Sequence, residues 1–240
     1  MQIKILETPE QAAQYAVSEW TKYLRKKPES LIDMASGDST KRTCELFCEI
    51  ANREETILKQ FFLIGLDEWV GIPPDTPGSC YHDFIVRLIQ PLQLSDKQYH
   101  FFNAMNPNLE NECKKMDKII EEKGGIDFMI VGIGLNGHIG FNEPGVNPEW
   151  FSHIIELDEI TKTRGQHYFS KNVPLQKGIT LGLKQVLNAR KVLLLALGEK
   201  KANIIKNAVC GEVTNLLPAS YLQLHPNCVV VTDRRAASLL

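Results

Sequence analysis

The sequence lacks long apolar runs, an excess of positive charge and paired cysteines, and each absence excludes a class of protein. The longest wholly apolar stretch, Val192 to Leu197, falls far short of the roughly 20 residues that a membrane-spanning helix needs. Lys and Arg together number 27 against 29 Asp and Glu, so the formal net charge of -2 gives nucleic acid or an anionic membrane no general electrostatic attraction. We therefore expect a soluble protein that binds neither of these partners and takes a small ligand.

Six cysteines are scattered along the chain without a C-x-x-C pair, and 240 residues can bury a core without disulfide bonds. Glu7 and Glu10 stand where a secretory signal would carry basic and then apolar residues. These features favour a cytoplasmic protein with reduced, mostly buried thiols. No linker, internal repeat or low-complexity tract interrupts the chain, so we expect a single domain over residues 1–240.

Short apolar runs alternate with longer segments of helical period, which is typical of an α/β protein with a parallel sheet covered by helices. The expected strands are Ile3–Leu6, Leu31–Ala35, Phe61–Leu66, Tyr99–Phe102, Phe128–Ile133, Lys191–Ala196 and Cys228–Thr232, with a weaker one at His153–Leu157. The expected helices are Glu10–Arg25, Thr40–Ala51, Ser79–Ile89, Leu109–Lys123 and Glu199–Val209. Ligands of such sheets bind beyond the carboxyl ends of the strands, so we expect the chemistry in the loops that follow them.

The first of these loops runs from Ser36 to Thr40 and carries small and hydroxyl-bearing residues in front of a helix. Backbone N–H groups, hydroxyls and a helix N-terminus can together bind a phosphate. The negative charge of Asp38 would repel an anion bound next to it. The alternative is that Asp38, Ser39 or Thr40 only caps the helix.

The second loop begins with two adjacent acids, Asp67 and Glu68, which leave a strand end just before a proline-rich turn. One carboxylate of such a pair can act as a general base while the other is anchored. The alternative is an ordinary solvated loop.

The third loop, Gly132–Gly145, contains a literal G-x-G-x-x-G pattern. A dinucleotide-binding fingerprint needs a helix to open at its last glycine, and the later Gly140 and Pro144 forbid a long helix here. The glycines instead allow a bent loop that brings His138 and Glu143 together. An imidazole with a carboxylate partner can move a proton near neutral pH. A hydrogen-bonded histidine in a glycine-rich turn is the structural alternative.

Other catalytic signatures are absent from the sequence. It has no G-x-S-x-G elbow and no P-loop, the usual marks of serine hydrolases and nucleotide triphosphatases. Cys44 and Cys48 share a helical face without a nearby histidine, and His82 and Asp83 have no matching ligands. No metal site is expected.

Together, the S-G-x-S loop, the D-E-x-V-G loop and the motif G-x-G-x-N-G-H-I-G-F-N-E-P resemble the glucosamine-6-phosphate deaminase (isomerase) family. The resemblance extends to Gly198–Ala202 and Ser220–Pro226, so it covers nearly the whole chain from about Leu31. It implies a single-domain, modified Rossmann-like parallel sheet with helices on both faces and no cofactor. It also implies an enzyme that converts an amino-sugar 6-phosphate and water into fructose 6-phosphate and ammonia.

The same resemblance implies roles for individual residues. The base that removes the C2 proton of the sugar corresponds to Asp67. The histidine that opens the sugar ring corresponds to His138, with Glu143 as its carboxylate partner and Asn136 beside them. The phosphate-binding positions correspond to Ser36, Gly37, Asp38, Ser39 and Lys201, together with Arg164 or His167 of a lid.

Three departures from the family pattern leave the exact sugar open. Asn136 stands where many members carry Asp, which predicts a less basic His138. His167 stands where the lid usually carries the phosphate-clamping arginine, and Arg164 is about one helical turn away as a substitute. Asp38 stands where members mostly carry Gly or Ser, which suggests a hydrogen bond to a sugar hydroxyl or amine.

Three other functions are kept open by the sequence. A galactosamine-6-phosphate deaminase would act on a sugar that differs only at C4. A 6-phosphogluconolactonase shares the fold and a G-x-G-x-D-G-H loop, although its loop has no N-E-P and it needs no carbon-proton base such as Asp67. A sugar-phosphate sensor is the third, and it has no need of Asp67, His138 and Glu143 together.

The resemblance also bears on assembly. Hexameric relatives bind an acetylated sugar phosphate between subunits, through a serine and a nearby basic cluster. The corresponding positions here are Val146, His153, Ile155 and Glu156, so a hydroxyl is missing and one cation has become an anion. We therefore expect a monomer or small homo-oligomer with hyperbolic kinetics.

Overall fold

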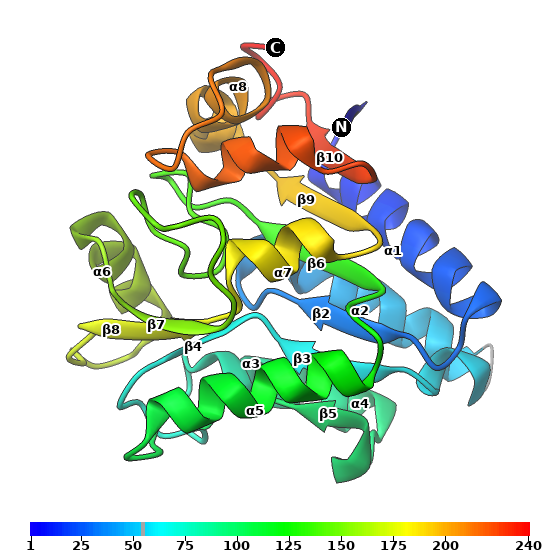
Figure 1. Ribbon diagram of the computed structural model, residues 1–240. Coiled ribbons are helices and arrows are strands. Elements are labelled where there is room, and N and C mark those ends of the chain that lie inside the picture. The colour runs from blue at the N-terminus through cyan, green and yellow to red at the C-terminus, as the bar shows by residue number, and fades with distance from the viewer. Residues whose placement is uncertain (54–55) are drawn as a thin grey trace.

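A computed structural model describes residues 1–53 and 56–240, and a seven-stranded sheet lies at its centre (Figure 1). Every neighbouring pair of strands in this sheet is parallel. In spatial order the strands are β1 (Gln2–Leu6), β10 (Cys228–Asp233), β9 (Val192–Ala196), β6 (Phe128–Gly132), β2 (Leu31–Met34), β3 (Phe62–Gly65) and β5 (Tyr99–His100). All eight expected strands are present, since β7 (His153–Glu156) is also formed, and their ends lie within about two residues of those predicted.

Helices cover both faces of the sheet because its inner strands are buried on both sides (Figure 1). Met129 and Val131 of β6 belong to one core cluster, and Ile130 between them belongs to the other. The first face packs against α5 (Leu109–Glu122), α7 (Leu183–Asn188) and α8 (Ala202–Cys210), and the second against α1 (Pro9–Lys26) and α2 (Asp38–Arg53). Each strand thus contributes alternate side chains to two apolar layers.

The expected helices are confirmed, with two differences. The segment Ser79–Ile89 is divided into α3 (Cys80–Phe84) and a π-helical turn at Ile85–Ile89, which continues into α4 (Gln90–Leu92). The segment at Glu199 begins with a 3-10 turn before α8. The predicted end of the helix at Lys123 is confirmed within one residue, because Gly124 and Gly125 follow it with positive φ and Gly125 N–H donates to Ile120 C=O at 2.8 Å.

A second, antiparallel sheet was not predicted. Its strands are β4 (Asp67–Trp69), β8 (Lys177–Thr180) and β7. The sequence predicts a loop at Asp67 and Glu68, because a three-residue strand has too short an apolar pattern to recognise. Strand β8 was missed because Gly178 interrupts it. That glycine is needed because a Cβ there would lie 2.3 Å from the Phe141 ring.

The small sheet supports a lid over the carboxyl ends of the central strands. The lid consists of α6 (Glu159–Gly165) and the 3-10 turn Gln166–Tyr168. A separate apolar cluster under the lid contains Trp69, whose ring centroid lies 4.5 Å from that of Phe141 and 6.2 Å from that of Phe169. This packing connects the lid to β4, and therefore to Asp67.

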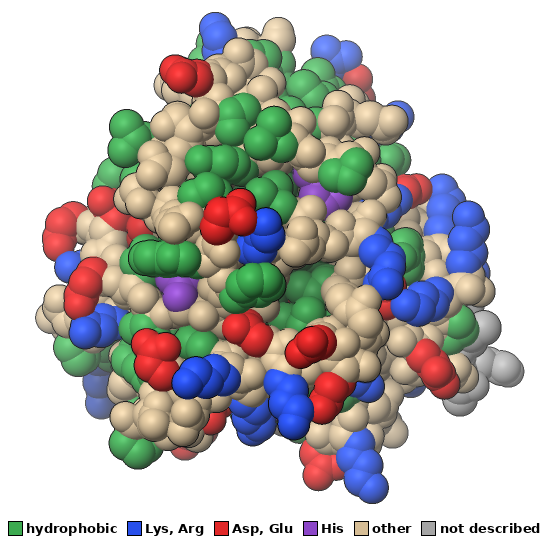
Figure 2. All heavy atoms as spheres, viewed as in Figure 1, with side chains coloured by type: hydrophobic (Ala, Val, Ile, Leu, Met, Phe, Trp, Pro, Cys, Tyr) green, Lys and Arg blue, Asp and Glu red, His purple; other side chains and the backbone are tan. Residues whose placement is uncertain are grey.

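The surface carries both signs of charge, and Figure 2 shows acidic and basic side chains interspersed over one face. No described helix is long and apolar enough to span a bilayer. All six cysteines are free thiols, five of them buried and Cys210 exposed.

Candidate active site

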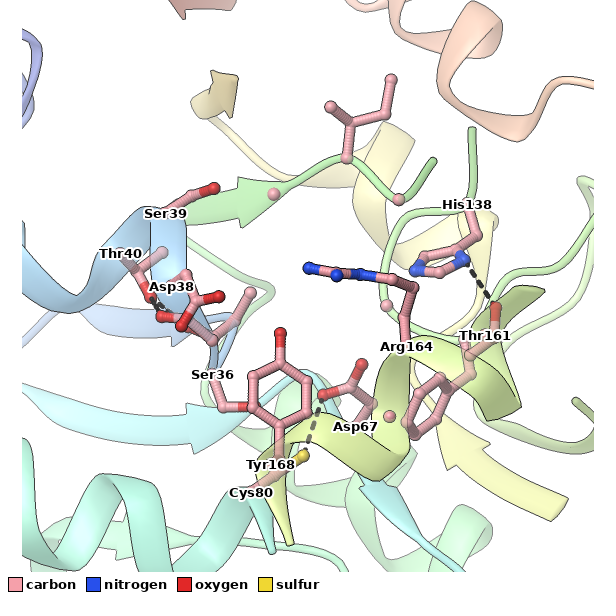
Figure 3. A pocket seen from close by; sticks show the side chains of 18 of the residues that line it. Ser36, Asp38, Ser39, Thr40, Asp67, Cys80, His138, Thr161, Arg164 and Tyr168 are labelled. Carbon is pink, nitrogen blue, oxygen red and sulfur yellow. Dashed lines mark hydrogen bonds between the residues drawn. The ribbon is translucent and has the colours of Figure 1, made fainter. Parts of the chain in front are cut away.

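The loops after β2, β3, β6 and β9 open into one cavity of about 540 Å³, and the lid closes it from the other side. The three loops selected from the sequence all line this cavity, as expected for the carboxyl end of a parallel sheet. In Figure 3, Asp67 and His138 lie toward one end of the cavity and Ser36, Asp38 and Ser39 toward the other. The structure therefore brings the two kinds of predicted site residue, acid-base and anion-binding, around one space.

Glu68 is the anchored member of the acid pair. Its carboxylate is 2% exposed and accepts three backbone N–H groups, those of Trp69 at 2.8 Å, Cys80 at 3.0 Å and Tyr81 at 2.8 Å. Two of these donors belong to the first turn of α3, where an acceptor satisfies N–H groups that the helix leaves free. Glu68 thus holds β4 against α3 and does not face the cavity.

Asp67 is the member of the pair that lines the cavity. Burial and the adjacent Glu68 carboxylate raise the pKa of Asp67 to about 7, while a hydrogen bond from Cys80 opposes the rise. The thiol sulfur lies 3.6 Å from Asp67 Oδ1. A carboxyl group with a pKa near neutrality can both take up and release a proton, which is what a general acid-base group needs.

His138 and Glu143 form the imidazole-carboxylate pair that the glycine-rich motif predicted. His138 Nδ1 lies 3.4 Å from Glu143 Oε2 and 3.0 Å from Thr161 Oγ1. Glu143 also accepts from Asn136 Nδ2 at 2.8 Å and from the Asp158 N–H at 3.3 Å. Burial alone would raise the pKa of Glu143, but the hydrogen bond and charge of His138 lower it below its usual value, so the carboxylate stays ionised.

The imidazole rests directly on its own loop, which explains one of the glycines. A Cβ at Gly134 would lie only 2.3 Å from His138 Cε1, so any other residue would displace the ring. With Nδ1 directed at Glu143 and Thr161, the other ring nitrogen points into the cavity (Figure 3). The loop thus presents one nitrogen to a ligand and fixes the other.

Asp83 and Arg87 hold the loop at the opposite end of the cavity through hydrogen bonds to its backbone. Gly37 has a φ of 116°. Its N–H points at Asp83 Oδ2 at 3.4 Å, and its C=O accepts from Arg87 Nη1 at 2.7 Å. Arg87 Nη2 in turn pairs with Asp83 Oδ1 at 2.8 Å. The loop shape is set by this ion pair, and the N–H of Gly37 is directed at Asp83 and not at a bound anion.

Basic side chains also line the cavity: Lys200, Lys201, Arg164, Arg87 and His167. Arg87 contacts Gly37 and the charge of Lys201 is coupled to that of Asp38, which places these two at the same end as the loop. Both alternatives for the lid cation are therefore at the site, and Figure 3 shows the Arg164 side chain reaching across the cavity. Lys201 Nζ donates to Ile133 C=O. Burial and then the charge of Arg164 lower the pKa of Lys201 to about 8, while Asp38 opposes the change. An anion placed among these groups would relieve their mutual repulsion.

Three residues at the site were not found from the sequence: Cys80, Thr161 and Tyr168. Cys80 touches Asp67, Thr161 touches His138, and Tyr168 lines the cavity between its two ends. Burial, and then the charge of Asp38, raise the pKa of Tyr168 to about 12, so its hydroxyl remains a donor. Each lies on a segment whose residues individually suggest only packing or solvent, so no local signal could have identified it.

Within residues 1–53 and 56–240, no group of three or more His, Cys, Asp or Glu side chains could hold a metal ion. The acids of the site are instead engaged with protein N–H groups, a thiol or an imidazole.

Comparisons with known proteins agree with this geometry. A family model described as glucosamine-6-phosphate isomerases/6-phosphogluconolactonase matches residues 6–231. The glucosamine-6-phosphate deaminase of Bacillus pumilus (strain SAFR-032) is 36% identical over 242 aligned residues, with 100% of both chains covered. That of Thermoanaerobacter pseudethanolicus (strain ATCC 33223 / 39E) is 34% identical, with 100% of this chain and 95% of the relative covered.

Solved structures give the same result. A monomeric glucosamine-6-phosphate deaminase superimposes with a TM-score of 0.96 at 30% identity, and 100% of each chain is covered. The 6-phosphogluconolactonase from Trypanosoma brucei superimposes with a TM-score of 0.81 at 16% identity, covering 100% of this chain and 98% of its own, which shows a shared fold. The resemblance drawn from the motifs is thereby confirmed: this chain belongs to the family of glucosamine-6-phosphate isomerases and 6-phosphogluconolactonases.

Proposed function

We propose that this protein converts glucosamine 6-phosphate and water into fructose 6-phosphate and ammonia. The observation that carries the proposal is the convergence of Asp67 with the His138–Glu143 pair in one cavity whose far end is cationic. Relatives that align over the whole chain are glucosamine-6-phosphate deaminases, which supports the same reaction. The reaction has three requirements: ring opening, proton transfer at carbon and a place for the phosphate.

Ring opening is assigned to His138. The closed sugar must lose the proton on O1 and gain one on the ring oxygen, and an imidazole can carry a proton between the two oxygens near pH 7. Glu143, 3.4 Å from Nδ1, stabilises the imidazolium that forms in passing. Asn136 holds the same carboxylate oxygen from the other side and keeps it oriented.

Proton transfer at carbon is assigned to Asp67. In the opened sugar, C1 is an aldehyde and C2 carries the amine. Asp67 takes the proton from C2, and the electron pair moves toward the aldehyde, whose O1 takes up a proton to give an enolamine. Asp67 then returns its proton to C1 while the nitrogen gives one up, which leaves an imine at C2. Water adds to C2 and ammonia leaves, giving the ketone of fructose 6-phosphate. The pKa of Asp67, raised to about 7 by burial and by Glu68, suits a group that takes a proton and gives it back.

The phosphate is assigned to the cationic end of the cavity. Lys201 and the lid residue Arg164 supply charge, His167 of the lid supplies a ring N–H, and Ser36 and Ser39 supply hydroxyls near the start of α2. Binding energy at this remote end can be used to hold C1 and C2 between Asp67 and His138. Asp38 lines the same region, and we assign it to a sugar hydroxyl or the amine.

Assembly and location belong to the same proposal. We propose a monomer or small homo-oligomer in the cytoplasm, acting as one domain. A monomeric deaminase with a TM-score of 0.96 supports the first part, and six free thiols support the second. Val146 is buried and Glu156 is itself an anion, so neither residue offers a hydroxyl or a cation to an anionic effector.

The test is a direct assay of the purified protein. Glucosamine 6-phosphate, galactosamine 6-phosphate and 6-phosphogluconolactone are supplied separately, and ammonia, ketose phosphate and free acid are measured. We expect ammonia and fructose 6-phosphate in equal amounts from glucosamine 6-phosphate. Faster turnover of galactosamine 6-phosphate would identify that sugar as the substrate. Hydrolysis of 6-phosphogluconolactone without ammonia release would overturn the proposal.

A further inference from the structure

The thiol beneath Asp67 is not used in the reaction described above. Cys80 lies at the first position of α3 and is 4% exposed, and its side chain borders the cavity next to Asp67. Sγ lies 3.6 Å from Asp67 Oδ1, within the range of a hydrogen bond to sulfur (Figure 3). The remaining oxygen of Asp67 points toward the middle of the cavity in the same view.

The position of the thiol is fixed by groups outside the cavity. The Cys80 N–H donates to Glu68 Oε1 at 3.0 Å, and the next N–H, that of Tyr81, donates to Oε2 at 2.8 Å. Ser79 caps the same turn through the His82 N–H. Because Glu68 follows Asp67 in β4, the backbone that carries the thiol and the backbone that carries the base are held by one buried carboxylate.

The direction of the hydrogen bond follows from the surroundings. Burial, followed by the charges of Glu68 and Asp67, raises the pKa of the Cys80 thiol well above its ordinary value. The thiol therefore keeps its proton at neutral pH and is a donor toward the carboxylate. The Ser36 side chain also hydrogen-bonds to the thiol, and Asp33 and Tyr168 are the other titratable groups whose charges are coupled to that of Asp67. An ionised Asp67 benefits from this donor more than a protonated one does.

We propose that Cys80 is a positioning residue for Asp67: its S–H holds Oδ1 and so turns Oδ2 toward the substrate carbon. The inference rests on the proposed function, in which Asp67 removes the C2 proton. Burial and Glu68 favour the protonated, inactive form of Asp67, and the thiol is the side chain that counteracts them. It thus keeps part of the base ionised and in one orientation at neutral pH.

The first test is the pH dependence of kcat/KM in Cys80→Ala, Cys80→Ser and, as a control, Cys113→Ala. Cys113 is another buried thiol, 3% exposed, in the core beneath the sheet. In Cys80→Ala we expect the acid limb to move up by about 0.5–1 pH unit, so that kcat/KM at pH 6 falls about 3–10-fold more than at pH 8.5. In Cys80→Ser, whose hydroxyl also donates, the acid limb should return to its position in the parent protein. In the control, Cys113→Ala, the acid limb should not move.

A merely structural role for Cys80 would lower activity equally at all pH values. The proposal is therefore wrong if the acid limb of Cys80→Ala coincides with that of the parent protein, or if Ser rescues nothing. The titration of the substrate phosphate is common to all variants and cancels in the comparison.

The second test needs no turnover. Methyl methanethiosulfonate is applied to the parent protein and to Asp67→Asn, and modification of the Cys80 peptide is followed by mass spectrometry, with exposed Cys210 as the internal reference. Removing the charge of Asp67 favours the thiolate, so Cys80 should react faster in the variant. A rate of Cys80 modification that is the same in both proteins would overturn the proposed hydrogen bond between Cys80 and Asp67. If the parent protein releases no ammonia, the proposed function fails, and this rate alone decides whether the thiol holds Asp67.

Discussion

Replacing Asp33 with Ala is expected to stabilise the protein. Asp33 lies in the middle of β2, between Ile64 of β3 and Met129 of β6, and is 0% exposed. Its neighbours Leu31 and Ala35, on the same side of the strand, belong to the apolar layer under α5 and α7. Among the described residues, no group donates a hydrogen bond to either carboxyl oxygen. Burial, and then the charge of Asp67, raise the pKa of Asp33 well above its usual value.

The size of the effect follows from two opposing contributions. A buried polar group without a partner costs about 1–3 kcal/mol. The space left by a carboxyl group costs about 1 kcal/mol when it is not refilled. Near pH 4 we therefore expect a net gain of about 0–2 kcal/mol, or up to roughly 8 °C in Tm for a chain of this length.

The gain should increase with pH. Asp33 binds its proton more tightly in the folded protein than in the unfolded chain, so above the unfolded pKa of about 4 the folded state becomes less stable as pH rises. Each pH unit between the two pKa values costs the parent protein about 1.4 kcal/mol, and Asp33→Ala does not incur that cost. The Tm difference between the two proteins is thus smallest near pH 4 and larger at pH 8.

Asp127 provides the matched control. It is equally buried at 1%, but its carboxylate accepts from the Leu31 N–H at 2.9 Å, Lys27 Nζ at 2.7 Å and Arg190 Nη1 at 2.8 Å. Asp127→Ala should lower stability by about 1–3 kcal/mol, because it leaves a buried N–H unpaired. Thermal unfolding of the three proteins at pH 4 and pH 8 makes the comparison. If Asp33→Ala is destabilised as Asp127→Ala is, or if its advantage does not increase with pH, the reasoning is refuted.

Four further predictions concern the reaction. Asp67→Asn should lower kcat by about 10²-fold or more while fructose 6-phosphate still binds, and a variant that keeps most of its rate contradicts the assignment of the base. His138→Gln should lose most with the closed sugar and less with an open-chain analogue, whereas equal losses would indicate a structural histidine. Because burial and Glu68 raise the pKa of Asp67 to about 7, kcat/KM should fall about tenfold per pH unit below that value, and a flat profile from pH 5 to 8 would exclude Asp67 as the titrating base. Rate curves should be hyperbolic and unaffected by N-acetylglucosamine 6-phosphate, and sigmoidal curves that this compound abolishes would refute the expectation.

Most of the central sheet could be predicted because buried parallel strands have an unmistakable composition. β9, Val-Leu-Leu-Leu-Ala, is buried at every residue and has no polar alternation to confuse it with a surface segment. β4 and β8 could not be found in the same way. Their residues, Asp-Glu-Trp and Lys-Gly-Ile-Thr, pair only because the lid and the Phe141 loop come from distant parts of the chain.

The residues of the candidate site likewise fall into those that could be predicted from the sequence and those that could not. Asp67, His138 and Glu143 could be predicted because their residue types can perform chemistry and their loops follow strands. Cys80 and Tyr168 could not, because a cysteine at a helix start and a tyrosine in a polar segment mean nothing until the fold places them. The ion pair of Asp83 with Arg87 follows from their spacing of four on a predicted helix, but their contact with Gly37 does not, since it depends on how this segment meets the loop after β2.

The broken helix from Cys80 to Ile89 contacts both ends of the cavity. Its first turn hydrogen-bonds to Asp67 and Glu68, and its Asp83 and Arg87 hydrogen-bond to the backbone of Gly37. The span between the Asp67 carboxylate and the Gly37 backbone is consequently set within a single short segment. Under the proposed function the substrate contacts both ends at once, so this span selects the length of the sugar phosphate. A residue inserted between Cys80 and Asp83 would change the distance between the two ends, and so the length of substrate that the cavity accepts.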